Sequence, residues 1–244
     1  MALYALGDTH LSFSADKPMD VFGGAWDNYV EKLKKGLSVL TGEDTLILCG
    51  DTSWALTFAQ AEADFAFLNA FPGRKLLVKG NHDYWWATAA KMRRFFAEQG
   101  FHTLDILHNN AWLYDGAYAL CGTRGWFYEE DSHQGTHDEK VFLRECGRLE
   151  MSLKAGLKLL GAPDGQPSPE LGEKLLVFLH YPPLYEGYRC DEIVALLTRY
   201  GIKQCYYGHL HGPAHRRAIE GEYHGIHYTL LSADYIRFQP VRIL

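Results

Sequence analysis

The sequence predicts an α/β fold, because short apolar runs alternate with segments of helical periodicity. The apolar runs cover residues 3–6, 45–49, 75–79, 175–179 and 204–207. Continuous apolar runs of this length are typical of strands that are covered on both faces. Strands that alternate with helices along a chain favour a layered α/β domain.

Five segments carry apolar residues at helical spacing, and we predict a helix for each: 26–40, 57–71, 87–99, 138–160 and 191–200. In the first of these, apolar side chains recur every three or four residues, which places them on one helical face. The interval 161–172 is rich in Pro and Gly and predicts a surface loop. After Ala214 the pattern is strand-like, without a helical signal.

The chain of 244 residues is long enough for one large α/β domain, and we predict a single domain that spans residues 1–244. The interval 122–170 could form a cap over a substrate. Its charged part, 133–148, fits either such a cap or a solvated helix face with ion pairs between neighbouring turns.

Composition narrows the function classes. A net charge of −6 disfavours nucleic acid as a partner, because nucleic-acid binders usually present a basic face. No run reaches the roughly 18 apolar residues that a membrane helix needs, and the short apolar start lacks the basic residues of a signal peptide. We therefore expect a cytoplasmic protein without a membrane partner. The odd cysteine count and the absence of a Cys-x-x-Cys pair disfavour a disulfide framework and a thiolate zinc site.

Metal-ligand side chains follow all five predicted strands, at the point where each strand ends. They are Asp8 and His10, then Asp51, then Asn81, His82 and Asp83, then His180, and finally His209 and His211. In open α/β sheets, functional groups gather at the carboxyl ends of strands. Imidazole suits transition metals such as Zn and Fe, and carboxylate and amide oxygens suit harder ions such as Mg and Mn.

This ligand set predicts two divalent metal ions, with Mn, Fe, Zn, Mg and Ni as the candidates. Asp51 is the best candidate for a carboxylate that bridges both ions. Two ions about 3.5 to 4 Å apart can clamp the oxygens of an in-line displacement at phosphorus. Their charge outweighs two carboxylates and one bound hydroxide, so the site would be net positive, as a phosphate-binding site requires.

In their order along the chain, these residues resemble the calcineurin-like metallophosphoesterase superfamily. The chain shows Asp8-Thr9-His10, Gly50-Asp51, Gly80-Asn81-His82-Asp83, a lone His180 and Gly208-His209-Leu210-His211. Each element alone is weakly specific, and five in this order are very specific. The resemblance implies two mixed β-sheets packed face to face as a sandwich, with helices outside.

The resemblance also implies roles by position. One metal would be held by Asp8, His10, Asp51 and His211. The other would be held by Asp51, Asn81, His180 and His209. His82 would be the catalytic histidine, which contacts the phosphate and protonates the leaving group, and Asn81 would also contact the substrate.

Two residues beside these motifs have alternative interpretations. Asp83 could orient His82 in catalysis, or it could cap the next helix, predicted to begin at Ala87. Arg124 lies between glycines after an apparent strand at 118–121, so it could bind the substrate phosphate through its bidentate guanidinium. It could equally form a surface salt bridge.

The aromatic residues Tyr84, Trp85 and Trp86 directly follow the third motif. They could stack on a flat leaving group, or they could anchor the following helix in the core. Trp54 occupies the position where protein phosphatases of the superfamily carry an Asp that supports the catalytic histidine. This departure weakens a protein-phosphatase interpretation.

These observations predict a metal-dependent phosphohydrolase. A metal-bound hydroxide would attack a phosphodiester, pyrophosphate or phosphomonoester of a small molecule, and His82 would act as general acid. The alternatives are a protein phosphatase and a non-catalytic interaction scaffold. The scaffold is disfavoured because every ligand position holds a competent ligand. A nuclease is disfavoured by the acidic charge.

Overall fold

A computed structural model describes residues 1–126, 136–162 and 164–244. The chain divides into two compact units. The first unit comprises Met1–Ile106, His211–Pro213 and Leu231–Leu244, and the second comprises Leu107–Leu210 and Ala214–Leu230. Each has its own β-sheet and its own hydrophobic core. The single-domain organisation stays a prediction, and the part of the predicted cap at 127–135 and 163 lies outside the described residues.

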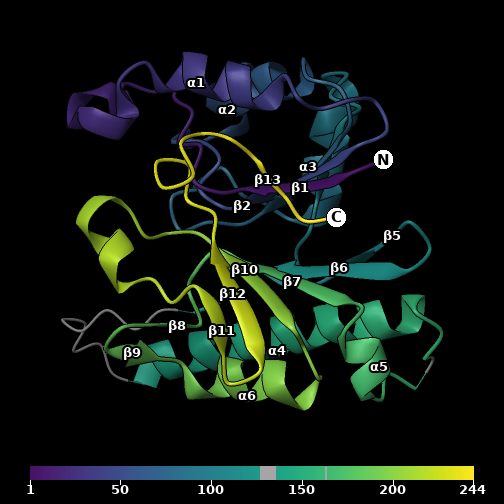
Figure 1. Ribbon diagram of the computed structural model, residues 1–244. Helices are drawn as coiled ribbons and strands as arrows, with labels where there is room; N and C mark the ends of the chain where they lie inside the picture. The colour runs from purple at the N-terminus through teal and green to yellow at the C-terminus, as the bar shows by residue number, and fades with distance from the viewer. Residues whose placement is uncertain (127–135, 163) are drawn as a thin grey trace. The chain divides into compact units, whose positions relative to one another are not determined.

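The first unit contains a five-stranded sheet in the order β13-β1-β2-β3-β4. Figure 1 labels β13, β1 and β2 of this sheet. Strands β1 to β4 are parallel and β13 is antiparallel to β1. The strands are β1 (Leu3–Leu6), β2 (Thr45–Cys49), β3 (Arg74–Val78), β4 (Leu104–Ile106) and β13 (Val241–Arg242). The helices are η1 (Met19–Phe22), η2 (Gly24–Trp26), α1 (Tyr29–Leu37), α2 (Phe58–Asn69) and α3 (Ala89–Glu98).

The second unit contains a six-stranded sheet in the order β11-β12-β10-β7-β6-β5. Its strands are β5 (Ala111–Tyr114), β6 (Tyr118–Thr123), β7 (Leu175–Leu179), β10 (Gln204–Tyr207), β11 (Gly221–Tyr223) and β12 (Ile226–Leu230). The four central strands are parallel, and β5 and β11 are antiparallel at the edges.

Helices cover this second sheet, and α4 and α6 run along one of its faces (Figure 1). They are α4 (Thr136–Leu159), α5 (Pro169–Gly172) and α6 (Asp191–Arg199). The remaining elements are the short hairpin β8 (Leu184–Tyr185) and β9 (Tyr188–Arg189) and the 3₁₀ helix η3 (Gly212–Arg217). The predicted α/β class with two mixed sheets flanked by helices is confirmed.

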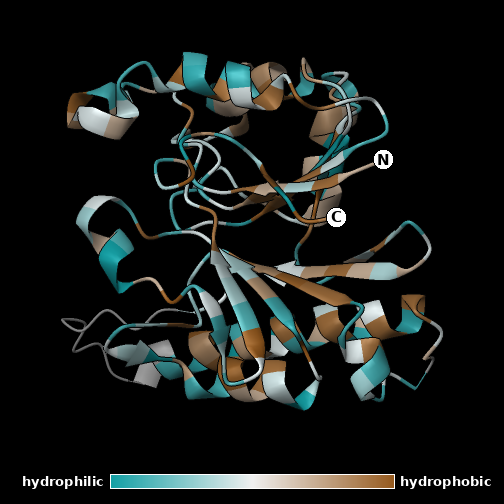
Figure 2. Ribbon diagram, in the orientation of Figure 1, coloured by the Kyte–Doolittle hydropathy of each residue, from teal (hydrophilic) through white to brown (hydrophobic). Residues whose placement is uncertain are grey.

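The hydrophobic pattern explains why the strands were predictable. Every residue of β2 and of β7 is buried, and all of these residues except Thr45 are apolar. The helices carry both hydrophilic and hydrophobic segments, because one side of each faces the core (Figure 2). The hydroxyl of Thr57 accepts a hydrogen bond from the backbone N–H of Gln60 and thereby caps α2.

The structure corrects three predictions about local structure. The interval 161–172 contains a short helix, α5, which begins where Ser168 caps the N–H of Leu171 and Pro169 occupies the first turn. The residues directly after Ala214, for which we predicted a strand-like pattern without helix, belong to the 3₁₀ helix η3, which ends at Arg217. The helix expected at Ala87 begins at Ala89 and has Thr88 as its N-cap.

The part of the chain that the structure describes contains no helix long and apolar enough to cross a membrane. The five cysteines are free, and four of them are buried. Burial raises the pKa of the Cys121 thiol to about 12, so this thiol is protonated and unreactive near neutral pH.

Candidate metal centre

Two neighbouring parallel strands of the first unit, β1 and β2, end beside one another, and each is followed by predicted site residues. Asp8 and His10 follow β1, and Asp51 follows β2. Each of these three residues has a left-handed backbone, with φ angles of 58°, 46° and 49°. Asp and His tolerate this region better than most residues, so the chain can leave each strand in a tight turn.

Hydrogen bonds fix these turns to each other. The backbone N–H of Asp8 donates to the carbonyl of Gly50 at 2.9 Å. The N–H of His10 donates to the carbonyl of Asp51, also at 2.9 Å. The loops that follow β1 and β2 are therefore held together by backbone hydrogen bonds, and these bonds fix the Cα positions of Asp8, His10 and Asp51.

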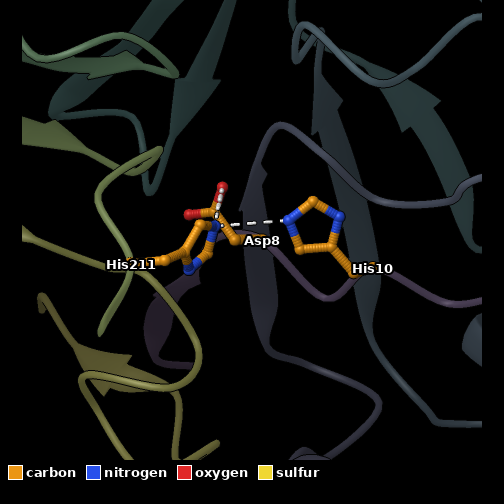
Figure 3. Close-up of side chains that lie close together, drawn as sticks. All are labelled: Asp8, His10 and His211. Carbon is orange, nitrogen blue, oxygen red and sulfur yellow. Dashed lines mark hydrogen bonds and ion pairs between the residues drawn. The ribbon is translucent and has the colours of Figure 1, made fainter. Parts of the chain in front are cut away.

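Asp8, His10 and His211 point their polar atoms toward one another (Figure 3). The Nε2 atoms of His10 and His211 are 3.3 Å apart, and Nε2 of His211 lies 3.6 Å from Oδ1 of Asp8. The three ligand atoms lie within 4.8 Å of one another. One carboxylate and two imidazoles therefore converge on a volume that a single ion can occupy.

Asp51 lies next to this triad. Its Oδ2 is 3.8 Å from Nε2 of His10 and 4.0 Å from Nε2 of His82. Its Oδ1 accepts the backbone N–H of His82 at 2.8 Å, which leaves Oδ2 directed at the imidazoles. Gly80 makes this contact between loops possible, because a Cβ at that position would lie 2.0 Å from Oδ1 of Asp51.

The site contains two buried acids, Asp8 and Asp51, and a nearby cation would stabilise their negative charge. Burial raises the pKa of Asp51 well above its ordinary value, and the neighbouring charge of Asp8 raises it further. Burial by itself lowers the pKa of His211, but the carboxylates of Asp8 and Asp234 more than reverse this effect and raise it to about 10. A raised pKa favours the protonated imidazolium of His211 near neutral pH, and a metal ion could supply that positive charge instead.

The donor set fits a divalent metal. Asp8 and His10 are almost completely buried, at 0% and 2% exposure, so their ligand atoms are shielded from competing water. Oxygen and imidazole nitrogen donors without thiolate suit Mn, Fe, Zn or Ni, with Mg favoured least by the imidazoles.

Asp234 is a site residue that the sequence interpretation missed. Its Oδ1 lies 2.8 Å from Nδ1 of His211, and its Oδ2 accepts the N–H of Gly212 at 3.1 Å. A carboxylate behind a histidine fixes the tautomer and directs Nε2 toward a metal. Asp234 follows a strand-like run, as Asp8 and Asp51 do, and this pattern could have identified it.

His82 has a different environment from the two histidines of the triad. Its side chain is 33% exposed, and its Nδ1 lies 3.5 Å from the hydroxyl of Tyr84. Its ring lies 4.3 Å from the indole of Trp54, which also stacks on His10 at 4.9 Å. Trp85, by contrast, is buried and packs edge-on against Phe65 in the core.

Asp83 is buried and ties the second and third motifs together. Its carboxylate accepts backbone N–H groups from Thr52 at 2.9 Å, Ser53 at 3.3 Å and Gly80 at 2.7 Å. Because Thr88 is the N-cap of α3, Asp83 is not the helix cap that we considered. Its bonds hold the loop that carries His82, and a catalytic role for Asp83 stays a prediction.

The second unit carries the other predicted residues at the ends of its own parallel strands. Arg124 follows β6, His180 follows β7 and His209 follows β10. The rings of His180 and His209 are 5.1 Å apart, and Tyr181 packs edge-on against His209 at 4.7 Å. The two histidines are thus close enough to bind one metal ion together.

Arg124 is engaged with an acid of α4. Its Nη2 lies 3.2 Å from Oε1 of Glu145, which is fully buried and also pairs with Arg148. The carbonyl of Arg124 accepts the N–H groups of His180 and Tyr181 at 3.1 and 2.8 Å. The substrate role of Arg124 stays a prediction, and its contacts give it a structural role beside His180.

Two solved structures are similar to this chain at low sequence identity. A protein of unknown function from Aquifex aeolicus is 16% identical, with 99% of this chain and 95% of that chain covered and a TM-score of 0.48. A phosphopantetheinyl hydrolase, PptH, from Mycobacterium tuberculosis is 15% identical, with 100% and 95% covered and a TM-score of 0.49. No curated protein matches the sequence.

The family comparison is more specific. Residues 1–213 match the family described as Calcineurin-like phosphoesterase, and this interval includes all five ordered motifs. The match covers most of the chain and agrees with the α/β class and with the acid–histidine cluster at the strand ends. The chain belongs to the Calcineurin-like phosphoesterase family.

Proposed function

We propose that this protein hydrolyses a phosphodiester, pyrophosphate or phosphomonoester of a small molecule with the help of two divalent metal ions. The observation that carries the proposal is the convergence of Asp8, His10 and His211 beside the buried carboxylate of Asp51. Two buried carboxylates so close together are electrostatically unfavourable without added positive charge. A phosphohydrolase uses that same positive charge to bind its substrate.

The proposed ligand sets follow the motifs. Asp8, His10, Asp51 and His211 hold one metal, and Asp51, Asn81, His180 and His209 hold the other. When bound, the two ions lower the pKa of water and offset the charge of the phosphate oxygens. The first set is supported by distances between 3.3 and 3.8 Å among its members. The membership of the second set is supported by its place in the ordered motifs.

His82 is the proposed general acid. It is the most exposed of the three histidines in the first unit's site, and its Nε2 faces Asp51 at 4.0 Å. Asp83 holds the backbone on which His82 sits, through the N–H of Gly80. We therefore assign Asp83 to positioning, and we assign Asn81 and Arg124 to contact with the substrate phosphate.

A small-molecule substrate is the preferred class. The protein-phosphatase alternative requires an acid near the catalytic histidine at position 54, and the structure has an indole there. The scaffold alternative is disfavoured by the buried, mutually repelling acids, which a protein without a metal would have little reason to retain. Localisation in the cytoplasm remains a prediction from the sequence.

Metal content tests the proposal most directly. We expect purified protein to bind two equivalents of Mn, Fe, Zn or Ni, and to hydrolyse at least one class in a panel of phosphate esters. Asp51→Asn should lose bound metal and activity together, because one substitution removes the bridging carboxylate. The matched control is Asp27→Asn, which removes an exposed carboxylate elsewhere. Wild-type metal content and activity in Asp51→Asn would contradict the bridging role.

A further inference from the structure

A cavity of about 490 Å³ opens beside the candidate metal centre within the first unit. One of its walls is polar and consists of His10, His82, His211 and Asp234. The remaining wall is mostly apolar, and its large side chains are Met19, Phe22, Trp26 and Trp54. Phosphate alone would need only the polar wall, so the apolar wall requires another explanation.

The apolar wall has a defined construction. The indole N–H of Trp54 donates to the sulfur of Met19 at 3.3 Å, and the indole stacks on His10. Trp26 is buried and packs edge-on against Tyr29. Met19, Trp26 and Trp54 thus have fixed positions, and the wall they form is rigid.

Phe22 completes the wall from the end of η1. Its side chain is 71% exposed, which is unusual for a phenylalanine that lines a cavity. The next two residues, Gly23 and Gly24, have φ angles of 61° and 60°, so the chain turns sharply between Phe22 and Trp26. An exposed aromatic at the rim of a cavity gains apolar contacts only when a ligand covers it.

We propose that this cavity binds a flat, apolar organic group of the substrate, such as an aromatic ring system, while the phosphate lies at the metal centre. The inference rests on the proposed phosphohydrolase function and adds to it the chemistry of the group attached to phosphorus. Small-molecule sites are usually concave and mostly apolar, with a few polar groups that fix orientation. This cavity has that composition, and its size falls within the usual range of roughly 300 to 1,000 Å³.

Phenyl and 4-biphenylyl phosphates test the inference, because their leaving groups have similar acidity and differ in apolar size. We expect wild-type protein to hydrolyse the biphenylyl ester with a KM lower by about tenfold, from the burial of the second ring. Phe22→Ser should raise the KM of the biphenylyl ester by about the same factor and leave that of the phenyl ester nearly unchanged.

Val21→Ser is the matched control. Val21 is 74% exposed and precedes Phe22 in η1, but it does not line the cavity. Its substitution removes a comparable exposed apolar side chain and should leave both KM values unchanged. Equal effects of Phe22→Ser and Val21→Ser, or equal KM values of the two esters for the wild type, would overturn the inference.

Binding of the corresponding phosphonates separates this inference from the proposed function. Phenylphosphonate and 4-biphenylylphosphonate cannot be hydrolysed, and calorimetry measures their affinity for metal-loaded protein. Tighter binding of the biphenylyl compound that Phe22→Ser abolishes supports the cavity assignment, even if no ester is hydrolysed and the proposed function fails. If the protein hydrolyses both esters but binds the two phosphonates with equal affinity, the cavity assignment is wrong and the proposed function stands.

Discussion

The histidines His211 and His82 differ in the group that contacts their Nδ1 atom. His211 has the carboxylate of Asp234 at its Nδ1, 2.8 Å away. His82 has the neutral hydroxyl of Tyr84 at its Nδ1, 3.5 Å away. A carboxylate partner makes the opposite nitrogen a stronger metal ligand, whereas a neutral partner leaves the ring able to exchange a proton. These surroundings support ligation for His211 and acid catalysis for His82.

Replacement of His82 tests the acid role. His82→Ala should keep its metal and lose about 10² to 10⁴ in turnover on esters with poor leaving groups. The loss should shrink for nitrophenyl esters, because their leaving group needs no proton. The control His102→Ala replaces an exposed histidine outside the motifs. Equal losses on good and poor leaving groups would refute the assignment.

Replacement of Asp234 tests its support of His211. Asp234→Asn should lower metal affinity by about 10- to 100-fold, as removal of such a carboxylate behind a ligand typically does. Competition with a chelator of known affinity measures this change, and Asp27→Asn should behave as wild type. Unaltered affinity in Asp234→Asn would show that the carboxylate serves the fold and not the metal.

The loops that follow β1, β2 and β3 carry most residues of the first unit's site, and His211 completes it. Asp83 bonds the third loop to the second, and backbone bonds join the second loop to the first. Gly80 lies where the second and third loops meet, because Asp51 occupies the space that a side chain would need. The glycine of the third motif is therefore required by packing.

A methyl group at this contact should separate the two loops. In Gly80→Ala, the added Cβ would lie 2.1 Å from the backbone nitrogen of Asp51, so the backbone must move. We expect a loss of stability of about 1 to 3 kcal/mol, which is typical of overpacking, together with weaker metal binding. Chemical denaturation and metal titration measure both effects. Gly42→Ala, where the Cβ meets nothing within 4 Å, should change neither.

The strands that carry the site could be predicted from sequence because each is a buried apolar run with a polar residue at its end. The bounds of β1, β2, β7 and β10 agree with prediction. Helix α5 was missed because a four-residue helix shows no periodicity, and only its Ser-Pro start could have indicated it. Asp234 was missed because it belongs to none of the five ordered motifs, and its contact with His211, 23 residues away in the chain, forms only in the folded protein; its place after a strand-like run was the one signal in the sequence.

The acidic net charge of the chain is compatible with a site that metal ions make locally positive. The formal net charge is −6, yet the proposed function needs local positive charge at the first unit's site. The ordered motifs were sufficient to identify the family across residues 1–213. They could not reveal the apolar cavity wall, because its residues come from η1, η2 and the loop after β2 and share no motif.

We expect the thermal stability that the protein gains on binding metal to depend on pH. The pKa of His211 is raised to about 10 from its ordinary 6.5, so its proton stabilises the metal-free fold below about pH 6.5. That stabilisation falls progressively as the pH rises toward 10, while a bound metal replaces the proton. The gain in Tm on adding metal should therefore increase from pH 6.5 to 9, as measured by scanning calorimetry. Asp234→Asn should shift this increase to lower pH, and a gain independent of pH would contradict the coupling.

Trp54 is placed where its fluorescence can respond to a bound metal ion. Its indole stacks on His10 and lies 4.3 Å from the ring of His82, so a fluorescent side chain sits against a proposed metal ligand. A paramagnetic ion held by His10 would quench that emission at close range. The protein therefore contains its own optical reporter of metal loading, and Trp54→Phe separates its signal from the other five tryptophans.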